Sequence, residues 1–181
     1  MKTKELYIKY TQQARIEHLR WVNNIKLLIS GVNVDEKVIA LNPVESSFGK
    51  WYYEKAILLA LPNSQIVLFD IEKLFLSIHD VYVKIYPLYY EKNKSIIGSI
   101  FGKRTHVSSH ETILVKQHYE EIVLISDKLK NKINLFEKIL HAIPDETFEE
   151  LLSFDNQDTP KGVPLKSEDD RKYHYGARCP S

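Results

Sequence analysis

The chain has 181 residues, and its 25 Lys and Arg residues against 24 Asp and Glu residues give a formal net charge of +1. This length is sufficient for one compact domain with a sizeable core. The near-zero net charge excludes a chain-wide field that would attract nucleic acid or an anionic membrane. The single cysteine, Cys179, excludes an internal disulfide and favours a reducing compartment. We therefore expect a cytoplasmic protein that binds no nucleic acid.

Membrane insertion and secretion are not expected either. The longest apolar block, residues 56–61, is far shorter than the roughly 20 residues that a membrane-spanning helix needs. Met1 is followed by Lys-Thr-Lys-Glu and then by an amphipathic pattern, so no apolar secretory signal is visible.

The first predicted helix runs from Glu5 to about Ile29, because apolar residues recur there every three or four positions. Ser30-Gly31 predicts its end, since Gly readily adopts the left-handed conformation found after many helices. His18, which lies in this stripe, is the first histidine that we expect in the core. The stripe consists of Tyr7, Thr11, Ala14, His18, Trp21, Ile25 and Leu28.

A connection and two further helices follow. Residues 33–47 contain a proline and have mixed polarity, which predicts a connection without strands. A short helix is expected from about Gly49 to Leu61, and Pro62-Asn63-Ser64 ends it. Ser64 is then expected to cap the next helix, which extends to about Tyr90. Pro87 is expected to bend the last turns of that helix.

Residues 92–107 break the helical pattern with two glycines and are locally basic, which predicts a loop or hinge. Ser108 and Glu111 then form a capping-box pattern at the start of a long helix, which should continue to about Ala142. The apolar stripe of this helix is interrupted by one polar residue, Ser126.

The last part of the chain, residues 155–181, is expected to be a flexible tail, because its charged and proline-containing composition is poor in aliphatic residues. Residues 1–154 contain three long amphipathic helices and a short one. The sequence therefore predicts an all-α fold, an antiparallel four-helix bundle with a C-terminal tail.

Four single residues and one six-residue segment of the predicted bundle have a recognisable spacing. His18 is followed three places later by Trp21, residues 46–51 read Ser-Ser-Phe-Gly-Lys-Trp, and Phe75 is followed four places later by His79. This arrangement resembles the chemoreceptor zinc-binding (CZB) domain. That family has a His with an aromatic or large apolar residue three places on, a Cys-x-apolar-Gly-x-aromatic loop, and a His-x-x-x-His pair on a later helix.

The resemblance implies a zinc site built from three histidines and one cysteine inside a helical bundle. It assigns the first ligand to His18 and the last to His79. Ser46 occupies the cysteine position, and Phe75 occupies the position of the first His of the pair. Zinc prefers nitrogen and thiolate ligands, and a serine hydroxyl does not supply the charge of a thiolate. His18 and His79 are thus the remaining metal-site candidates, and zinc is the cofactor that the resemblance implies.

Three interpretations of this pocket remain open. In the first, His18 and His79 are buried polar residues that bond to each other, to Ser46 or to water, and Phe75 fills the space of the metal. In the second, a metal is held by the two histidines together with carboxylates. In the third, another ligand occupies the pocket. The candidate carboxylates are Glu45, Glu72 and Asp80.

The resemblance also implies a function, because CZB domains regulate bacterial chemoreceptors and cyclic-di-GMP synthases and often dimerise. We expect a stand-alone cytoplasmic sensory or regulatory module that acts through a signalling partner, such as a chemoreceptor, a cyclase or a component of a histidine-kinase pathway, with a homodimer as a further option. The alternative is a structural or interaction bundle that has lost metal sensing. We do not expect an enzyme, since no Ser-His-Asp order, nucleophilic cysteine or apolar carboxylate pair is present.

Overall fold

The structure is a computed structural model, and it describes residues 3–91 and 108–155. These residues contain helices and helical turns but no strands, so the prediction of an all-α fold is confirmed. The predicted loop at 92–107 and the predicted tail beyond residue 155 lie outside the described residues. The helices are α1 (Thr3–Ile29), α2 (Ser47–Trp51), α3 (Gln65–Tyr89), α5 (Ser109–Ala142) and α6 (Asp145–Asp155).

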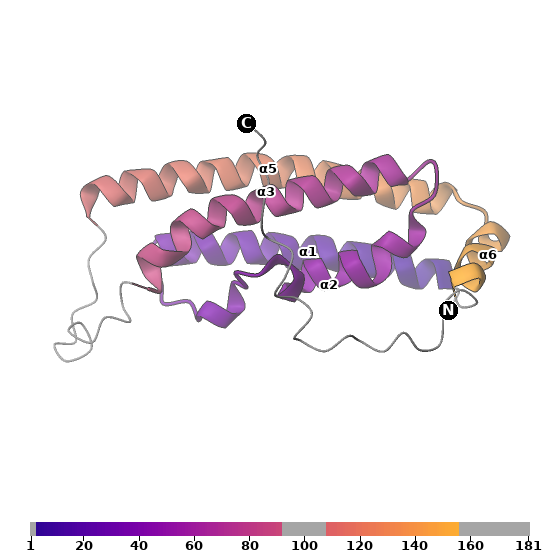
Figure 1. The fold of residues 1–181 in the computed structure, drawn as a ribbon, viewed down its shortest axis with the longest axis horizontal. Helices are drawn as coiled ribbons and strands as arrows, with labels where there is room; N and C mark the ends of the chain where they lie inside the picture. The colour runs from indigo at the N-terminus through magenta and orange to yellow at the C-terminus, as the bar shows by residue number, and fades with distance from the viewer. Residues whose placement is uncertain (1–2, 92–107, 156–181) are drawn as a thin grey trace, which may run out of the picture.

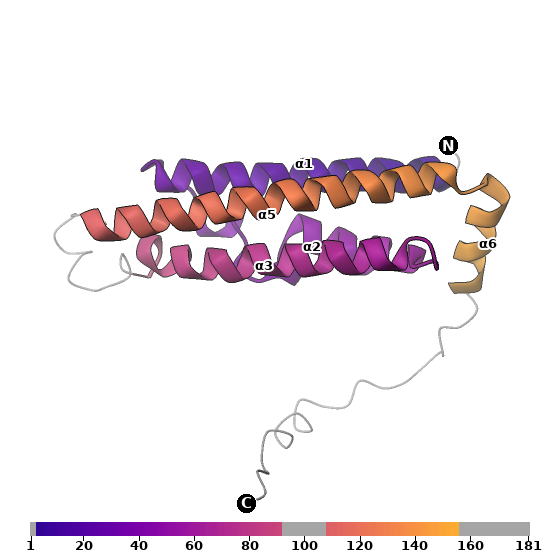
Figure 2. The same cartoon turned by 90° about the horizontal axis from the view of Figure 1, so that it is seen from above.

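The three long helices lie lengthwise beside one another (Figures 1 and 2). Helices α1 and α3 run in the same direction, and α5 runs back and contacts both. Helix α2 contacts α1, and α6 lies crosswise at the end of the molecule where α1 begins (Figure 2). None of the described helices has the length and apolar character that crossing a bilayer requires.

The fourth helix of the predicted bundle is not continuous. The expected helix from Gly49 to Leu61 begins two residues earlier, as α2, and then changes to a π-helical turn at Tyr52–Ala56 and a 3₁₀ turn at Ile57–Leu59. A π turn is wider than an α turn and shifts which residues face the core. Both Trp51 and Tyr52 are consequently buried, and the Tyr52 hydroxyl donates a hydrogen bond to the Leu68 carbonyl oxygen over 3.0 Å.

Two of the predicted helix ends are confirmed. Gly31 follows α1 with a φ of 87°, the left-handed conformation that its position predicts. The capping box of α5 is complete, because the Ser108 amide donates to a Glu111 carboxylate oxygen (2.9 Å) and the Glu111 amide donates to the Ser108 hydroxyl oxygen (3.3 Å). These ends involve only neighbouring residues, which explains why the sequence reveals them.

Ser64 occupies the N-cap position of α3, as predicted, but its side chain does not make the expected capping bond. Its hydroxyl accepts a hydrogen bond from the Leu61 amide (2.8 Å) and donates one to the Leu59 carbonyl oxygen (2.5 Å), so it closes the preceding turn and makes no capping bond to α3. The backbone of Ser64 is already helical, with φ −110° and ψ −21°, whereas a capping residue is normally extended. At its other end, α3 continues through Pro87 to Tyr89.

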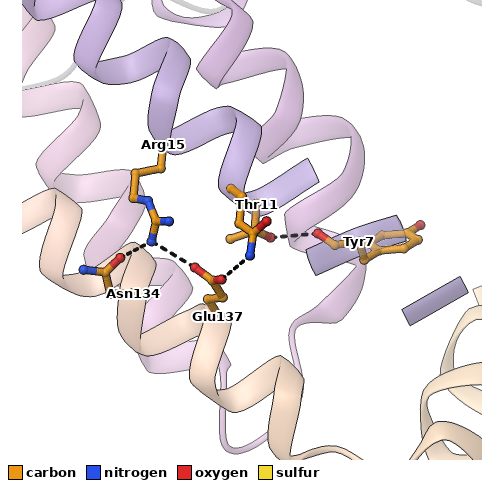
Figure 3. A network of polar contacts seen from close by, with 6 residues as sticks. Tyr7, Thr11, Arg15, Asn134 and Glu137 are labelled. Carbon is orange, nitrogen blue, oxygen red and sulfur yellow. Dashed lines mark hydrogen bonds and ion pairs between the residues drawn. The ribbon is translucent and has the colours of Figure 1, made fainter. Parts of the chain in front are cut away.

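A half-buried polar network sets the register of α1 against α5 (Figure 3). The Arg15 guanidinium donates hydrogen bonds to Asn134 and to a Glu137 carboxylate oxygen, the latter over 2.9 Å. The Gln12 amide donates to the other Glu137 oxygen over 2.6 Å. Charge-assisted hydrogen bonds of this kind are directional, so this network fixes which turns of the two helices lie opposite each other.

Helix α6 was not predicted, although it ends at Asp155, where the tail was expected to begin. Phe148 is fully buried, and its ring makes an edge-to-face contact with Tyr7 at a centroid distance of 5.6 Å. The Lys4 ammonium donates to the carbonyl oxygens of His141 and Ile143 at the end of α5 (3.0 and 2.5 Å). These contacts connect α6 and the end of α5 to the first turns of α1.

Candidate functional site

A cavity of about 180 Å³ lies between α1, α3 and the segment that leads into α2. Exposed charged residues surround its rim, and aromatic rings form its inner wall. All four positions that correspond to zinc ligands in the CZB pattern line this cavity. They are His18, Ser46, Phe75 and His79.

His18 projects from α1 into the core and is only 2% exposed. Its Nε2 lies 2.8 Å from the hydroxyl oxygen of Ser126 on α5, so the two side chains share a buried hydrogen bond. Burial, and secondly the nearby His79, lower the pKa of His18 from 6.5 to about 4. The His18 imidazole is therefore neutral at physiological pH.

His79 lies on α3 and is 3% exposed. Its Nδ1 is 3.3 Å from the backbone carbonyl oxygen of Leu41. A carbonyl oxygen can only accept, so Nδ1 carries the proton and Nε2 remains a hydrogen-bond acceptor. Burial lowers the pKa of His79 to about 4, even though the Leu41 carbonyl and the Asp80 carboxylate favour the protonated form.

The Ser46 side chain forms hydrogen bonds with the backbone at the start of α2. Its hydroxyl accepts a hydrogen bond from the Gly49 amide (2.9 Å) and donates one to the Pro43 carbonyl oxygen (2.7 Å), which makes Ser46 the N-cap of α2. A Cβ atom on Gly49 would lie 2.1 Å from the Pro43 carbonyl oxygen. A side chain therefore has no room at Gly49, where the backbone passes close to the Pro43 carbonyl group.

Phe75 packs within an aromatic cluster beside the histidines. Its ring centroid lies 4.7 Å from that of Phe48 and 4.8 Å from that of His79. The centroid of the Trp21 ring also lies 4.7 Å from that of His79. Trp21 Nε1 is the buried side-chain nitrogen without a hydrogen-bond partner among the described residues. Two carbon rings thus pack against the His79 imidazole, which also lines the cavity.

The donor set does not fit a tetrahedral zinc ion. Phe75 offers no donor atom, and the Ser46 hydroxyl already makes two hydrogen bonds. Glu72 lies close to Tyr53 and is not among the residues that line the cavity. Glu45 and Asp80 are exposed, and within residues 3–91 and 108–155 no three His, Cys, Asp or Glu side chains are arranged to hold a metal.

Neither of the two protein partners that the first interpretation offered for the histidines is observed. His18 and His79 do not bond to each other or to Ser46, and their partners are Ser126 and the Leu41 carbonyl. Ser126 did leave a signal in the sequence, since it is the polar residue that interrupts the apolar stripe of α5. The Leu41 carbonyl left none, because any residue could supply it.

Comparison of the chain with protein-family models, with curated proteins and with solved structures finds no match. The resemblance to the CZB family therefore stays a prediction from the spacing of residues 18–79.

Proposed function

We propose that this chain is a cytoplasmic sensory or regulatory module in which the occupancy of the cavity between α1 and α3 controls the binding of a signalling partner. The resemblance to CZB domains supports a partner of the chemoreceptor, cyclase or histidine-kinase class. The cavity is a suitable input site because it is lined by two helices that span the length of the molecule. A ligand between them changes their packing, and a partner on the outer surface responds to that change.

The observation that carries this proposal is the pair of buried, neutral histidines on different helices at one cavity. Polar groups are costly to bury, and each histidine is held in place by one hydrogen bond from another part of the chain. His79 Nε2 remains available as an acceptor at the cavity, because Nδ1 makes the bond to Leu41.

Ligand occupancy fits the electrostatics better than protonation does. Both histidines have a pKa of about 4, so neither changes charge in the folded protein between pH 6 and 8. A signal based on protonation in that range would need a pKa near 6.5. The trigger that the site supports is therefore an uncharged or weakly polar molecule.

The dimensions and walls of the cavity suggest the class of ligand. An engineered protein cavity of about 150 Å³ accommodates benzene, and this cavity has about 180 Å³. The walls include the rings of Trp21, Phe48 and Phe75, and His79 Nε2 can accept a hydrogen bond. A single aromatic ring with a hydroxyl or N–H donor matches these features, and phenol is the simplest probe of that kind.

Titration with phenol, followed by two-dimensional amide NMR, tests the proposal. We expect saturable shifts of amide signals in both α1 and α3. Ala40→Leu narrows the cavity without changing either histidine and should abolish these shifts. Ala142→Leu, at an exposed residue at the end of α5, is the matched control and should preserve them. Absence of saturable binding, or equal binding by the Ala40→Leu variant, contradicts the proposal.

The alternative function is a structural or interaction bundle that works through a fixed surface. Phe75 favours this alternative, because its ring packs between Phe48 and His79 as an ordinary core residue does. A variant that carries both His18→Leu and His79→Leu separates the two functions. Loss of the phenol response with retained folding supports the sensory module, whereas a wild-type chain with no response supports the structural bundle.

A further inference from the structure

The outer face of α3 carries a row of exposed residues on the side opposite to its buried apolar face, which includes Ile71, Ile78 and Ile85. The row follows the alternating three- and four-residue spacing that places residues on one helical face. All six members are exposed. This α3 outer stripe consists of Ile66, Phe69, Lys73, Leu76, Asp80 and Val83.

Four of the six residues are large and apolar. Ile66, Phe69, Leu76 and Val83 are 72%, 63%, 38% and 51% exposed, respectively. Together they present roughly 400 Å² of apolar surface, which is within the range of about 300–600 Å² for the largest patch on a typical monomer, and such patches often mark interaction sites. The outer face of α5 carries no comparable apolar row around its exposed Leu124. That leucine is 65% exposed, but its neighbours on the helix are charged.

The two charged members of the stripe have opposite signs and lie symmetrically about its centre. Lys73 precedes Leu76 by three positions, and Asp80 follows it by four. Both side chains are exposed, and neither forms a salt bridge within the described part of the chain. The stripe therefore has an apolar centre, with a cation on one side and an anion on the other that form no salt bridge among the described residues.

We propose that the α3 outer stripe binds the same stripe of a second copy of this chain, with the two helices antiparallel about a two-fold axis near Leu76. A two-fold axis brings residue i of one chain to residue j of the other and j to i. Lys73 then faces Asp80 of the partner subunit, and the pair occurs twice. Phe69 lies near Val83 of the partner subunit, and the two Leu76 side chains meet at the axis.

The charges select this orientation. In a parallel pair, each Lys73 would face a lysine and each Asp80 an aspartate, and like charges oppose association. The apolar area is below the roughly 800 Å² per partner of a standard interface, so the dimer is weak and reversible. This inference does not rest on the cavity ligand, and its test measures oligomeric state alone.

Sedimentation equilibrium of the complete chain, over about 1 µM to 1 mM, tests the proposal. We expect a reversible monomer–dimer equilibrium. Phe69→Glu should raise the dissociation constant at least about tenfold, because it places a charge in the apolar contact. Leu124→Glu, at an equally exposed leucine on α5, is the matched control and should leave the constant unchanged.

Charge exchange tests the antiparallel geometry. Lys73→Glu and Asp80→Lys should each raise the dissociation constant about tenfold, because each creates two like-charge contacts across the axis. The double variant with both changes should return to within about twofold of the wild type, since the pair is restored in reverse. Circular dichroism confirms folding of each variant. The proposal is overturned if the chain stays monomeric at all concentrations. It is also overturned if the dissociation constant of the double variant is as high as those of the single variants.

Discussion

Removal of the Ser126 hydroxyl is the most direct test of the site, because it takes away the partner of His18. The Ser126→Ala change leaves His18 Nε2 buried, in a side chain that is 2% exposed, with no hydrogen bond from α5. An unsatisfied buried polar group costs about 1–3 kcal/mol of folding free energy. We expect a loss of that size in the free energy of unfolding, which for a chain of this length corresponds to a decrease in melting temperature of roughly 2–12 °C.

A double-mutant cycle isolates the contribution of the hydrogen bond. His18→Leu leaves the Ser126 hydroxyl, which can turn to a carbonyl oxygen of its own helix, so this change should cost less than Ser126→Ala. The variant with both changes replaces the polar pair with an apolar contact and should be more stable than the sum of the single effects, by about 1–2 kcal/mol.

Urea denaturation at pH 7 measures these free energies, with an unchanged m value as the check that the unfolding transition is the same. Ser77→Ala is the matched control, because Ser77 on α3 bonds only to its own helix through the Lys73 carbonyl oxygen. We expect it to change stability by less than about 0.5 kcal/mol. If Ser126→Ala is as mild as this control, or if the cycle is additive, our account of the buried pair is wrong.

Three further predictions follow from the site. Gly49→Ala should destabilise the protein by at least about 2 kcal/mol in urea denaturation, because its Cβ would lie 2.1 Å from the Pro43 carbonyl oxygen. A Gly49→Ala variant as stable as the wild type would show that the turn can open. The free energy of unfolding should fall as the pH decreases from about 6.5 to about 4. In this range the unfolded chain takes up protons that His18 and His79 do not bind when folded. The expected loss is up to about 1.4 kcal/mol per pH unit for each histidine. The variant with Leu at both positions should have a flatter profile in denaturation curves at pH 7, 5.5 and 4.5, and an equally steep profile would refute the assignment. Elemental analysis of protein purified without a histidine tag should find no stoichiometric zinc, since two of the four donor positions are Ser46 and Phe75; one zinc ion per chain would contradict this.

The sequence by itself determined the long helices. The bounds of α1, α3 and α5 follow from apolar residues that repeat with the period of a helix, and the ends at Gly31 and Ser108 depend on residues within one turn. Such signals are local, so they do not depend on the rest of the fold. The same local reasoning failed at Ser64, where the hydroxyl bonds backward to Leu59 instead of capping α3.

The interrupted helix at residues 47–59 and helix α6 required the tertiary structure. The π turn orients Trp51 and Tyr52 toward a core formed by other helices, and Phe148 of α6 is buried against Tyr7 at the opposite end of the sequence. Burial of this kind depends on which surfaces meet, and a short segment with mixed polarity does not reveal it.

The candidate site also has a part that could be expected from the sequence and a part that required the tertiary structure. The resemblance to the CZB pattern implied that His18, Ser46, Phe75 and His79 share one pocket, and all four line the cavity. The partners of the histidines came only from the packed structure. Ser126 reaches His18 because α5 returns alongside α1, and Leu41 meets His79 through a backbone carbonyl that every residue type has. The sequence thus determined which side chains gather at the site. The tertiary structure decided which hydrogen-bond partners these side chains have, because hydrogen bonds between distant segments depend on the register of the packed helices.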